Sequence, residues 1–437
     1  MQRILVVQVA ALGHRFLVDN NDGLSLAGLQ FKSLQSIFPA VTCSVQSTMR
    51  TAALPSEHGM VGNGFYHRDL SKPMFWEQSS QLCQGERIWD SFRKSRKRVG
   101  QLFIQQSLGT DTDILVSPAP IHKHHGGMIQ DCYSRPSGLY SKIVKKIGRP
   151  FKLGWYWGPV ASVKSSQWIV DATVEVMQSE SPDLLFTYLP HLDYELQRSG
   201  PDSEESGRAF AQLKLLLNKL LDEARDVGYK ILVYSDYAIS NVSRPVFPNR
   251  LLRRAGLFQT RQIRKMQYPD FYSSRAFAVV DHQIAHIVIN DPSAIDAVRE
   301  LFSATEGIAE VLGDDEKKQY GIDHPRSGDL VIVSDSDAWF AYPWWEEKSE
   351  APEYATHIDI HNKPGYDPCE LFFGFPPPFA VSTDATKIHG SHGRIGAGTD
   401  TVWAMDSDLG MSGEPADLRE LAAALRELLS KQGLDKK

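Results

Sequence analysis

Apolar segments of strand length alternate with helical patterns through the first half of the chain, and this alternation constrains the fold more than any other feature. The segments DLLFTYL (residues 183–189) and KILVYSD (residues 230–236) flank a helical pattern over residues 203–228 that ends in a glycine. Both apolar segments are continuous, which is typical of parallel strands covered by helices on both faces. The sequence therefore predicts an α/β fold with a mostly parallel central sheet.

The pattern changes twice along the chain, and it predicts three parts. Residues 1–245 carry the first part of the α/β core. Residues 246–350 contain shorter, more alternating strands and form either a small cap, an inserted subdomain, or a continuation of the core. Residues 351–437 return to the core and close with an amphipathic helix, PADLRELAAALRELLSKQG.

Composition excludes several classes of protein. The 437 residues carry a formal net charge of −6, which gives no basic field for a nucleic acid polymer. No run of about 18 apolar residues occurs, so no membrane span is expected. The N-terminal MQRILVVQVAALGHRFL is interpreted as a buried strand rather than a secretory signal. Four widely spaced cysteines without a CxxC pair indicate reduced thiols and a cytoplasmic protein: Cys43, Cys83, Cys132 and Cys369.

The segment FPAVTCSVQSTMRTAALPSEHGMVGN, residues 38–63, contains the first candidate for chemistry. It predicts a helix from Thr42 to Leu54 that Pro55 ends, with Thr42 at or near the N-cap. Backbone N–H groups and the helix dipole at that end favour an anion and lower the cost of an alkoxide on Thr42. Taken alone, Thr42 is also explained as a helix cap and nothing more.

Two aspartates lie where predicted strands end. LPHLDYELQRSGP, residues 189–201, places Asp193 four residues before Gln197, and YSDYAIS contains Asp236. Chemistry in parallel sheets collects at the carboxyl ends of the strands, so both aspartates are candidates for a site.

These segments together resemble the nucleotide pyrophosphatase/phosphodiesterase branch of the alkaline phosphatase superfamily. Three later segments follow the family's order: LPHLDYELQRSGP resembles its D-x-x-x-H-x-x-G-P motif, YSDYAIS its S-D-H-G element, and GSHGR its late histidine element. Within residues 38–63 the matching positions are Phe38, Pro39, Thr42, Pro55, His58, Gly59 and Asn63. The resemblance implies an alkaline-phosphatase-like fold.

The resemblance also assigns roles to residues. Thr42 would be the nucleophile, and Asn63 would bind a phosphoryl oxygen. Three of the six metal ligands that accompany the threonine in the usual two-zinc site are retained, and three are replaced. The retained ligands are Asp193, Asp236 and His392, and the replacements are Ala10, Gln197 and Tyr237.

The replacements change what the site is expected to bind. Asp193, His392 and the weaker ligand Gln197 would still hold one divalent ion, zinc, manganese or magnesium, whereas the ion that would activate Thr42 has lost most of its ligands. We therefore expect one metal ion rather than two.

Histidines elsewhere offer compensation. His122, His124 and His125 follow the apolar segment DILVS and precede a glycine pair, so they either contact metal or phosphate or form an exposed polar loop. His124 and His125 are predicted substrate-binding residues. His282 and His286 lie four apart in an expected strand, where they would share one face; a metal role for the pair is an alternative that we do not favour.

These observations predict a metal-dependent hydrolase of phosphate mono- or diesters that works through a phosphoryl-threonine intermediate. One alternative is a weak or inactive pseudoenzyme that binds a phosphorylated ligand. A further alternative is a phosphonate hydrolase or a phosphoryl transferase on the same scaffold. In each case the partner is a small phosphorylated molecule, with no nucleic acid polymer and no membrane, and the sequence does not indicate the oligomeric state.

Overall fold

The protein is built on an eight-stranded sheet whose strand order is β11-β8-β7-β12-β1-β13-β24-β4. The computed structural model describes residues 2–21, 23–125, 127–378 and 380–434. The five central strands run parallel, and the three others pair antiparallel at the two ends of the sheet. The parallel strands are β8 (Ile114–Pro118), β7 (Val99–Leu102), β12 (Leu184–Leu189), β1 (Arg3–Val9) and β13 (Tyr229–Ser235), and the antiparallel ones are β11 (Cys132–Arg135), β24 (Thr401–Met405) and β4 (Lys32–Leu34).

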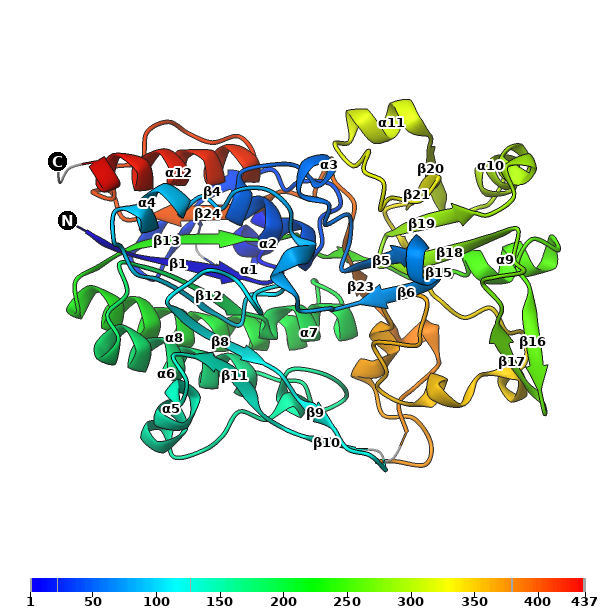
Figure 1. Cartoon of the computed structure of the whole chain (residues 1–437), viewed down its shortest axis with the longest axis horizontal. Helices are drawn as coiled ribbons and strands as arrows, with labels where there is room; N and C mark the ends of the chain where they lie inside the picture. Colours follow the sequence, from blue (N-terminus) through cyan, green and yellow to red (C-terminus); the bar gives the residue numbers. More distant parts are fainter. Residues whose placement is uncertain (1, 22, 126, 379, 435–437) are drawn as a thin grey trace.

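Helices cover both faces of this sheet, as the continuous apolar strands require (Figure 1). The first face carries α2 (Thr42–Thr51), α4 (Asp90–Lys94) and α12 (Leu418–Leu434), and the opposite face carries α5 (Leu139–Ile147), α6 (Lys164–Ser179), α7 (His191–Ser199) and α8 (Glu204–Asp226). The α/β class, the mostly parallel sheet and the two helical layers are confirmed.

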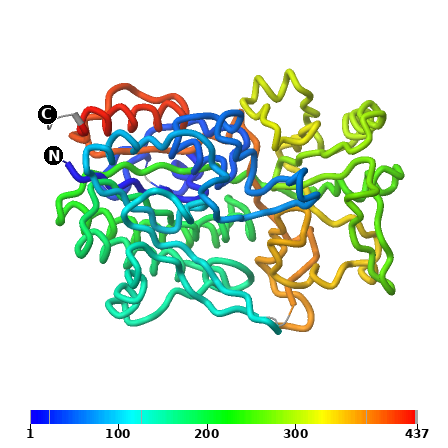
Figure 2. Tube along the Cα trace, viewed as in Figure 1, coloured from blue at the N-terminus to red at the C-terminus, as the bar shows by residue number. Residues whose placement is uncertain are grey.

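A second, four-stranded antiparallel sheet lies beyond the carboxyl ends of the parallel strands (Figures 1 and 2). Its core includes side chains of the early hairpin formed by β5 and β6, so residues near 65 and 280 pack together. The sheet contains β18 (Ala276–Asp281), β19 (Ile284–Ile289), β21 (Leu330–Ser334) and β20 (Ile308–Leu312); the hairpin contains β5 (Gly64–His67) and β6 (Lys72–Phe75), and the neighbouring helices are α9 (Pro248–Arg254), α10 (Ile295–Ser303) and α11 (Asp314–Gln319).

Short elements connect these layers. They are α1 (His14–Asn20), α3 (Pro55–His58) and the two-stranded ribbons β2 (Ser25–Leu26) with β3 (Leu29–Gln30), β9 (Ile121–His122) with β10 (Met128–Ile129), β14 (Ser240–Asn241) with β23 (Gly390–Ser391), β15 (Arg244–Val246) with β22 (Ala338–Phe340), and β16 (Thr260–Ile263) with β17 (Met266–Pro269).

The helix that begins at Thr42 is shorter than the sequence predicts. It ends at Thr51, because Ala52 adopts a left-handed conformation with φ of 54° and its N–H donates to the carbonyl of Thr48. Pro55 therefore opens α3 instead of ending the preceding helix. The start of the helix agrees with the prediction, since Val41 is the N-cap and Thr42 is the first helical residue.

Two predictions about the environment of the chain can be compared with the structure. All four cysteines are unpaired and buried. Among the helices in the described ranges, none combines the length and the apolar character that a bilayer crossing needs. The cytoplasmic location stays a prediction.

Gly365 makes a close contact that joins the late segment to the second sheet. Its φ is 157°, and a Cβ there would lie 2.6 Å from the carbonyl oxygen of Val280. The next residue, Tyr366, donates its N–H to that same oxygen at 3.0 Å. The glycine therefore lets the chain approach β18 closely enough to place Tyr366.

We predict that Gly365→Ala destabilises the protein by about 1–3 kcal/mol more than Gly396→Ala, because of overpacking against the Val280 backbone. Gly396 is a matched control: it has a φ of 117°, and no heavy atom beyond its chain neighbours would lie within 4 Å of an added Cβ. Chemical denaturation of both variants measures the difference. Equal free energies of unfolding would contradict the close-packing argument.

Candidate active site

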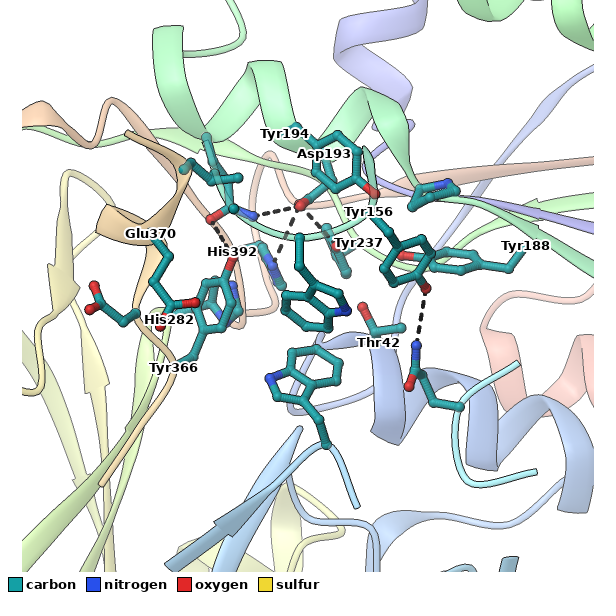
Figure 3. A pocket seen from close by; sticks show the side chains of 18 residues that line it. Thr42, Tyr156, Tyr188, Asp193, Tyr194, Tyr237, His282, Tyr366, Glu370 and His392 are labelled. Atoms are coloured by element: carbon teal, nitrogen blue, oxygen red, sulfur yellow. Dashed lines mark hydrogen bonds and ion pairs between the residues drawn. The ribbon is translucent and has the colours of Figure 1, made fainter. Parts of the chain in front are cut away.

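A pocket lies between the carboxyl edge of the central sheet and the second sheet. Both sheets contribute to its wall, since Asp193 and Tyr237 follow strands of the first and His282 follows a strand of the second. Figure 3 shows Thr42, Asp193, Tyr237 and His392 turned toward one another within it. The structure thus brings together four residues that are far apart in the sequence.

Thr42 stands on the pocket wall at the first turn of α2 and is 5% exposed. The extended conformation of Val41, with φ of −133°, turns the chain into the helix so that the first N–H groups lack helical partners. One of them, the N–H of Cys43, donates to Asn63 Oδ1 at 3.0 Å. This buried hydrogen bond, called the Asn63 brace below, fixes the first turn of the helix that carries Thr42.

The other polar groups of Asn63 form hydrogen bonds as well. Its Nδ2 donates to Asp281 Oδ1 at 3.0 Å, and its backbone N–H donates to Asp281 Oδ2 at 2.7 Å. The residue is buried and is absent from the described residues that line the pocket. Its role in binding a phosphoryl oxygen stays a prediction, while the structure shows that it links the start of α2 to β18.

Asp193 and Gln197 lie on one face of α7, four residues apart. Gln197 Nε2 donates to Asp193 Oδ2 at 2.6 Å, and the phenol of Tyr237 donates to Asp193 Oδ1 at 3.0 Å. Burial raises the pKa of Asp193 to about 6, although both hydrogen bonds oppose the rise. Each oxygen of this carboxylate thus already has a neutral donor.

Asp236 directly follows β13 and is fully buried beneath the pocket. Its Oδ2 accepts from Gln8 Nε2 at 2.8 Å, and its Oδ1 accepts from the N–H groups of Ala11 and Tyr237, both at 3.0 Å. Burial raises the pKa of Asp236 to about 7, and the nearby Asp193 adds to the rise. The backbone N–H of Ala11, next to the replaced position Ala10, is one of the groups that satisfy this carboxylate.

His392 is a neutral imidazole with a fixed tautomer. Its Nδ1 lies 2.8 Å from the carbonyl oxygen of Ala40, which can only accept, so Nδ1 carries the proton. Burial lowers the pKa of His392 well below its ordinary value. Its Nε2 lies 3.9 Å from Asp193 Oδ1, and its ring stacks on Tyr237 with centroids 3.5 Å apart and planes 2° apart.

Asp281 and His282 belong to the site, although the sequence analysis did not assign either to it. His282 Nδ1 donates to Asp281 Oδ1 at 2.7 Å, and the His282 ring lies 3.9 Å from the His392 ring and 4.1 Å from the Tyr366 ring, between centroids. Burial raises the pKa of Asp281 to about 6 and lowers that of His282 to about 3. The signal that could have identified both residues is their position at the end of a strand that faces the central sheet.

The single strand predicted through His282 and His286 is wrong. A turn after Asp281 separates β18 from β19, and His282 has a φ of 62° within it. His286 is buried in β19, where its Nε2 donates to the carbonyl of Val61 at 2.9 Å and its Nδ1 accepts from the N–H of Gly328 at 3.1 Å. The two histidines therefore do not share a face, and both ring nitrogens of His286 are engaged by backbone groups.

The loop that carries His124 and His125 lies away from these groups. Both histidines are exposed in the turn between β9 and β10, and neither is among the described residues that line the pocket. His122 lines a neighbouring cavity together with Trp76 and Trp157, which line the pocket as well. Substrate binding by His124 and His125 stays a prediction.

The residues present do not fit a two-ion centre. Within the described ranges, no group of three or more histidine, cysteine, aspartate or glutamate side chains is arranged to hold a metal. Asp236 is saturated by three donors, and Tyr237 and Gln197 occupy both oxygens of Asp193. The expected single-ion set, Asp193, Gln197 and His392, does come together, but Gln197 turns its amide nitrogen rather than its oxygen toward Asp193.

Aromatic side chains form the rest of the wall. Trp76 and Trp157 meet edge to face with centroids 4.9 Å apart, and Tyr366 donates its hydroxyl to Gln197 Oε1 at 3.4 Å. The sequence carries a weak signal for this wall in the aromatic segments KPMFWEQ and GWYWGP. Among the described lining residues there is no lysine or arginine.

The fold is alkaline-phosphatase-like. The chain belongs to the type I phosphodiesterase/nucleotide pyrophosphatase family, whose model matches residues 22–367. The resemblance seen in the sequence is therefore confirmed. Membership of this family supports a phosphoryl hydrolase.

Solved structures share the fold at low sequence identity. Phosphonoacetate hydrolase from Sinorhizobium meliloti 1021, solved with phosphonoformate, is 14% identical with a TM-score of 0.61, covering 98% of this chain and 96% of that one. Ectonucleotide pyrophosphatase/phosphodiesterase 5 is 14% identical with a TM-score of 0.60 in its murine form and 15% identical with 0.61 in its human form, each covering 98% of this chain and 95% of the other. No curated protein matches the chain.

We predict that Asn63→Ala lowers the free energy of unfolding by about 1–3 kcal/mol, because it leaves the buried N–H of Cys43 without an acceptor. Asn218→Ala, on the exposed side of α8, is the control and should change stability by less than about 0.5 kcal/mol. Chemical denaturation measures both. Wild-type stability in Asn63→Ala would contradict the Asn63 brace.

Proposed function

We propose that this chain hydrolyses phosphate mono- or diesters of small molecules, with Thr42 as the nucleophile. The observation that carries the proposal is the position of Thr42: it stands at the first turn of a helix, on the wall of a pocket that Tyr237, Asp193 and His392 also line (Figure 3). This arrangement couples a hydroxyl to an anion-binding helix end and to proton-accepting groups.

The proposed reaction has two steps. The Thr42 oxygen attacks phosphorus and the alcohol departs, which leaves a phosphoryl-threonine that water then hydrolyses. N–H groups in the first turn of α2 would stabilise charge on the phosphoryl oxygens, because the helix N-terminus is locally positive. The aromatic wall formed by Trp76, Trp157 and Tyr366 would exclude water from the leaving group.

Structural neighbours support this assignment of the nucleophile and of the substrate class. A threonine-to-alanine variant of the murine ectonucleotide pyrophosphatase/phosphodiesterase 5 is inactive and was solved with AMP. Phosphonoacetate hydrolase was solved with phosphonoformate and with phosphonoacetate. A small phosphorylated molecule, or a phosphonate, is the corresponding ligand proposed for this chain.

If one divalent ion binds, Asp193, His392 and Gln197 are the residues that would hold it. A zinc, manganese or magnesium ion would supply charge stabilisation for the phosphoryl group. Gln197 would first have to turn its amide over, so that its oxygen replaces the nitrogen that now donates to Asp193.

A ligand-binding protein without turnover is the second candidate. It is favoured by the absence of lysine and arginine among the described lining residues, since no fixed cation there would stabilise a developing phosphoryl charge. The same pocket would then retain a phosphorylated molecule through the helix N-terminus and the aromatic wall.

We predict that Thr42→Ala abolishes hydrolysis of bis-p-nitrophenyl and p-nitrophenyl phosphate, with a loss on the order of 10³-fold or more, whereas Thr42→Ser retains most of the activity. The serine variant is the matched control because it keeps the hydroxyl. Rates are measured with chelator and with added zinc, manganese or magnesium.

An unchanged rate in Thr42→Ala would overturn the role of Thr42. A wild-type rate at the level of the alanine variant under every condition would instead favour the ligand-binding protein for these substrates.

A further inference from the structure

The carboxylates at the site are satisfied by side chains from replaced positions and by side chains packed beside them. Tyr237 and Gln197 stand where the family resemblance places histidine ligands, and together they donate to both oxygens of Asp193. The backbone N–H groups of Ala11 and Tyr237 and the amide of Gln8 do the same for Asp236. At Asp193 the substitutions therefore remove ligands and also supply donors, whereas the donors to Asp236 are backbone N–H groups and the side chain of Gln8.

These donors are held in place by further contacts. Gln8 and Tyr234 are register partners on neighbouring strands, and the Tyr234 hydroxyl donates to Gln8 Oε1 at 3.0 Å, which directs the Gln8 NH₂ group to Asp236. The Tyr366 hydroxyl contacts Gln197 Oε1 in the same way at 3.4 Å. Each amide is thus oriented as a donor toward a carboxylate, opposite to the orientation that metal binding needs.

Tyr237 occupies a central place in this network. Its ring lies flat on His392, and its phenol donates to Asp193. Tyr237 and Thr42 line the same pocket and face each other within it (Figure 3). A hydroxyl can accept one proton while donating another. Tyr237 is therefore able to connect Thr42 with Asp193.

We propose that hydrogen bonds from Tyr237, Gln197 and Gln8 take the place of both metal ions at this site, and that Tyr237 relays the proton of Thr42 to Asp193. The replacement of the metal ions is independent of turnover. The proton relay rests on the function proposed above.

Proton transfer accompanies the attack on phosphorus in the first step. The Thr42 oxygen bonds to phosphorus as its proton passes to Tyr237, and the phenol proton of Tyr237 passes to the Asp193 carboxylate. The phosphorus–oxygen bond to the alcohol breaks, and the alkoxide leaves with the electron pair and takes a proton from water.

In the second step, the oxygen of a water molecule bonds to phosphorus and the bond to Thr42 breaks. Asp193 returns its proton through Tyr237 to the Thr42 oxygen. One proton of the attacking water stays on the phosphate, and the other converts the hydroxide left by the first step to water. The enzyme is restored, and one water has been added across the ester.

Measurements of metal binding test whether hydrogen bonds replace the metal ions. Wild-type protein purified without chelator should contain no stoichiometric zinc, manganese or magnesium by elemental analysis, and zinc titration calorimetry should give no site. The triple variant Ala10→Asp/Gln197→His/Tyr237→His restores the family's ligand types and should take up zinc. Stoichiometric metal in the wild type would overturn the proposal, and a triple variant that is folded by circular dichroism yet binds no zinc would contradict the part given to these residues.

Turnover measured in the presence of chelator tests the proton relay. We expect Tyr237→Phe to lower kcat by about 10²-fold or more while KM changes little, because only the proton relay is lost. Tyr229→Phe is the matched control: it removes a buried hydroxyl at the other end of β13 that bonds the carbonyl of Pro182, and it should leave kcat unchanged.

The outcomes separate the two proposals. Equal kcat values in Tyr237→Phe and wild type, or a wild-type rate that chelator abolishes and zinc restores, would overturn the relay. Loss of activity in Thr42→Ala together with either result would leave the hydrolase assignment standing.

Discussion

Three buried carboxylates at the meeting point of the two sheets set the conditions that the rest of the site must satisfy. Asp193, Asp236 and Asp281 are 8%, 0% and 1% exposed. An ionised group without water must find hydrogen-bond donors or opposite charge. Among the residues that the structure describes, the hydrogen-bond donors to all three are neutral: side-chain amides, a phenol, backbone N–H groups and a neutral imidazole. The positions of Gln8, Tyr237, Gln197 and Asn63 follow from that requirement.

The central sheet places these donors. Register pairs Val9 of β1 with Leu189 of β12 and with Ser235 of β13, so the residues that follow the three strands emerge at one edge. Asp236 leaves β13 directly, and α7 carries Asp193 back over the same edge. The second sheet closes the pocket from the opposite side with Asp281 and His282, and Gly365 allows Tyr366 to pack on the imidazole.

Local patterns account for much of what could be predicted. Continuous apolar segments identify the parallel strands, and the aspartates directly after them identify the edge where chemistry is expected. The helix at Thr42 begins where its cap and proline pattern indicates. These features depend on residues close together in the sequence, and the family motifs add the order of the late elements.

Contacts between distant segments account for what the sequence could not provide. Nothing near Gln8 indicates that its amide meets Asp236, and nothing near Tyr237 indicates that its ring lies on His392. The turn at His282 was missed because Asp281 and His282 interrupt an apolar alternation without a glycine or a proline. Trp76 and Trp157 converge only through the packing of the hairpin and a loop that are 81 residues apart.

The central claim is that this site holds neutral hydrogen-bonding groups where the family resemblance implies metal ions. The most direct measurement is ¹⁵N NMR of histidine-labelled protein at neutral pH during a zinc titration, with a His392→Gln variant to assign the signal. We expect a neutral Nδ1–H tautomer for His392 whose Nε2 resonance does not move when zinc is added. A stoichiometric shift of that resonance would contradict the central claim.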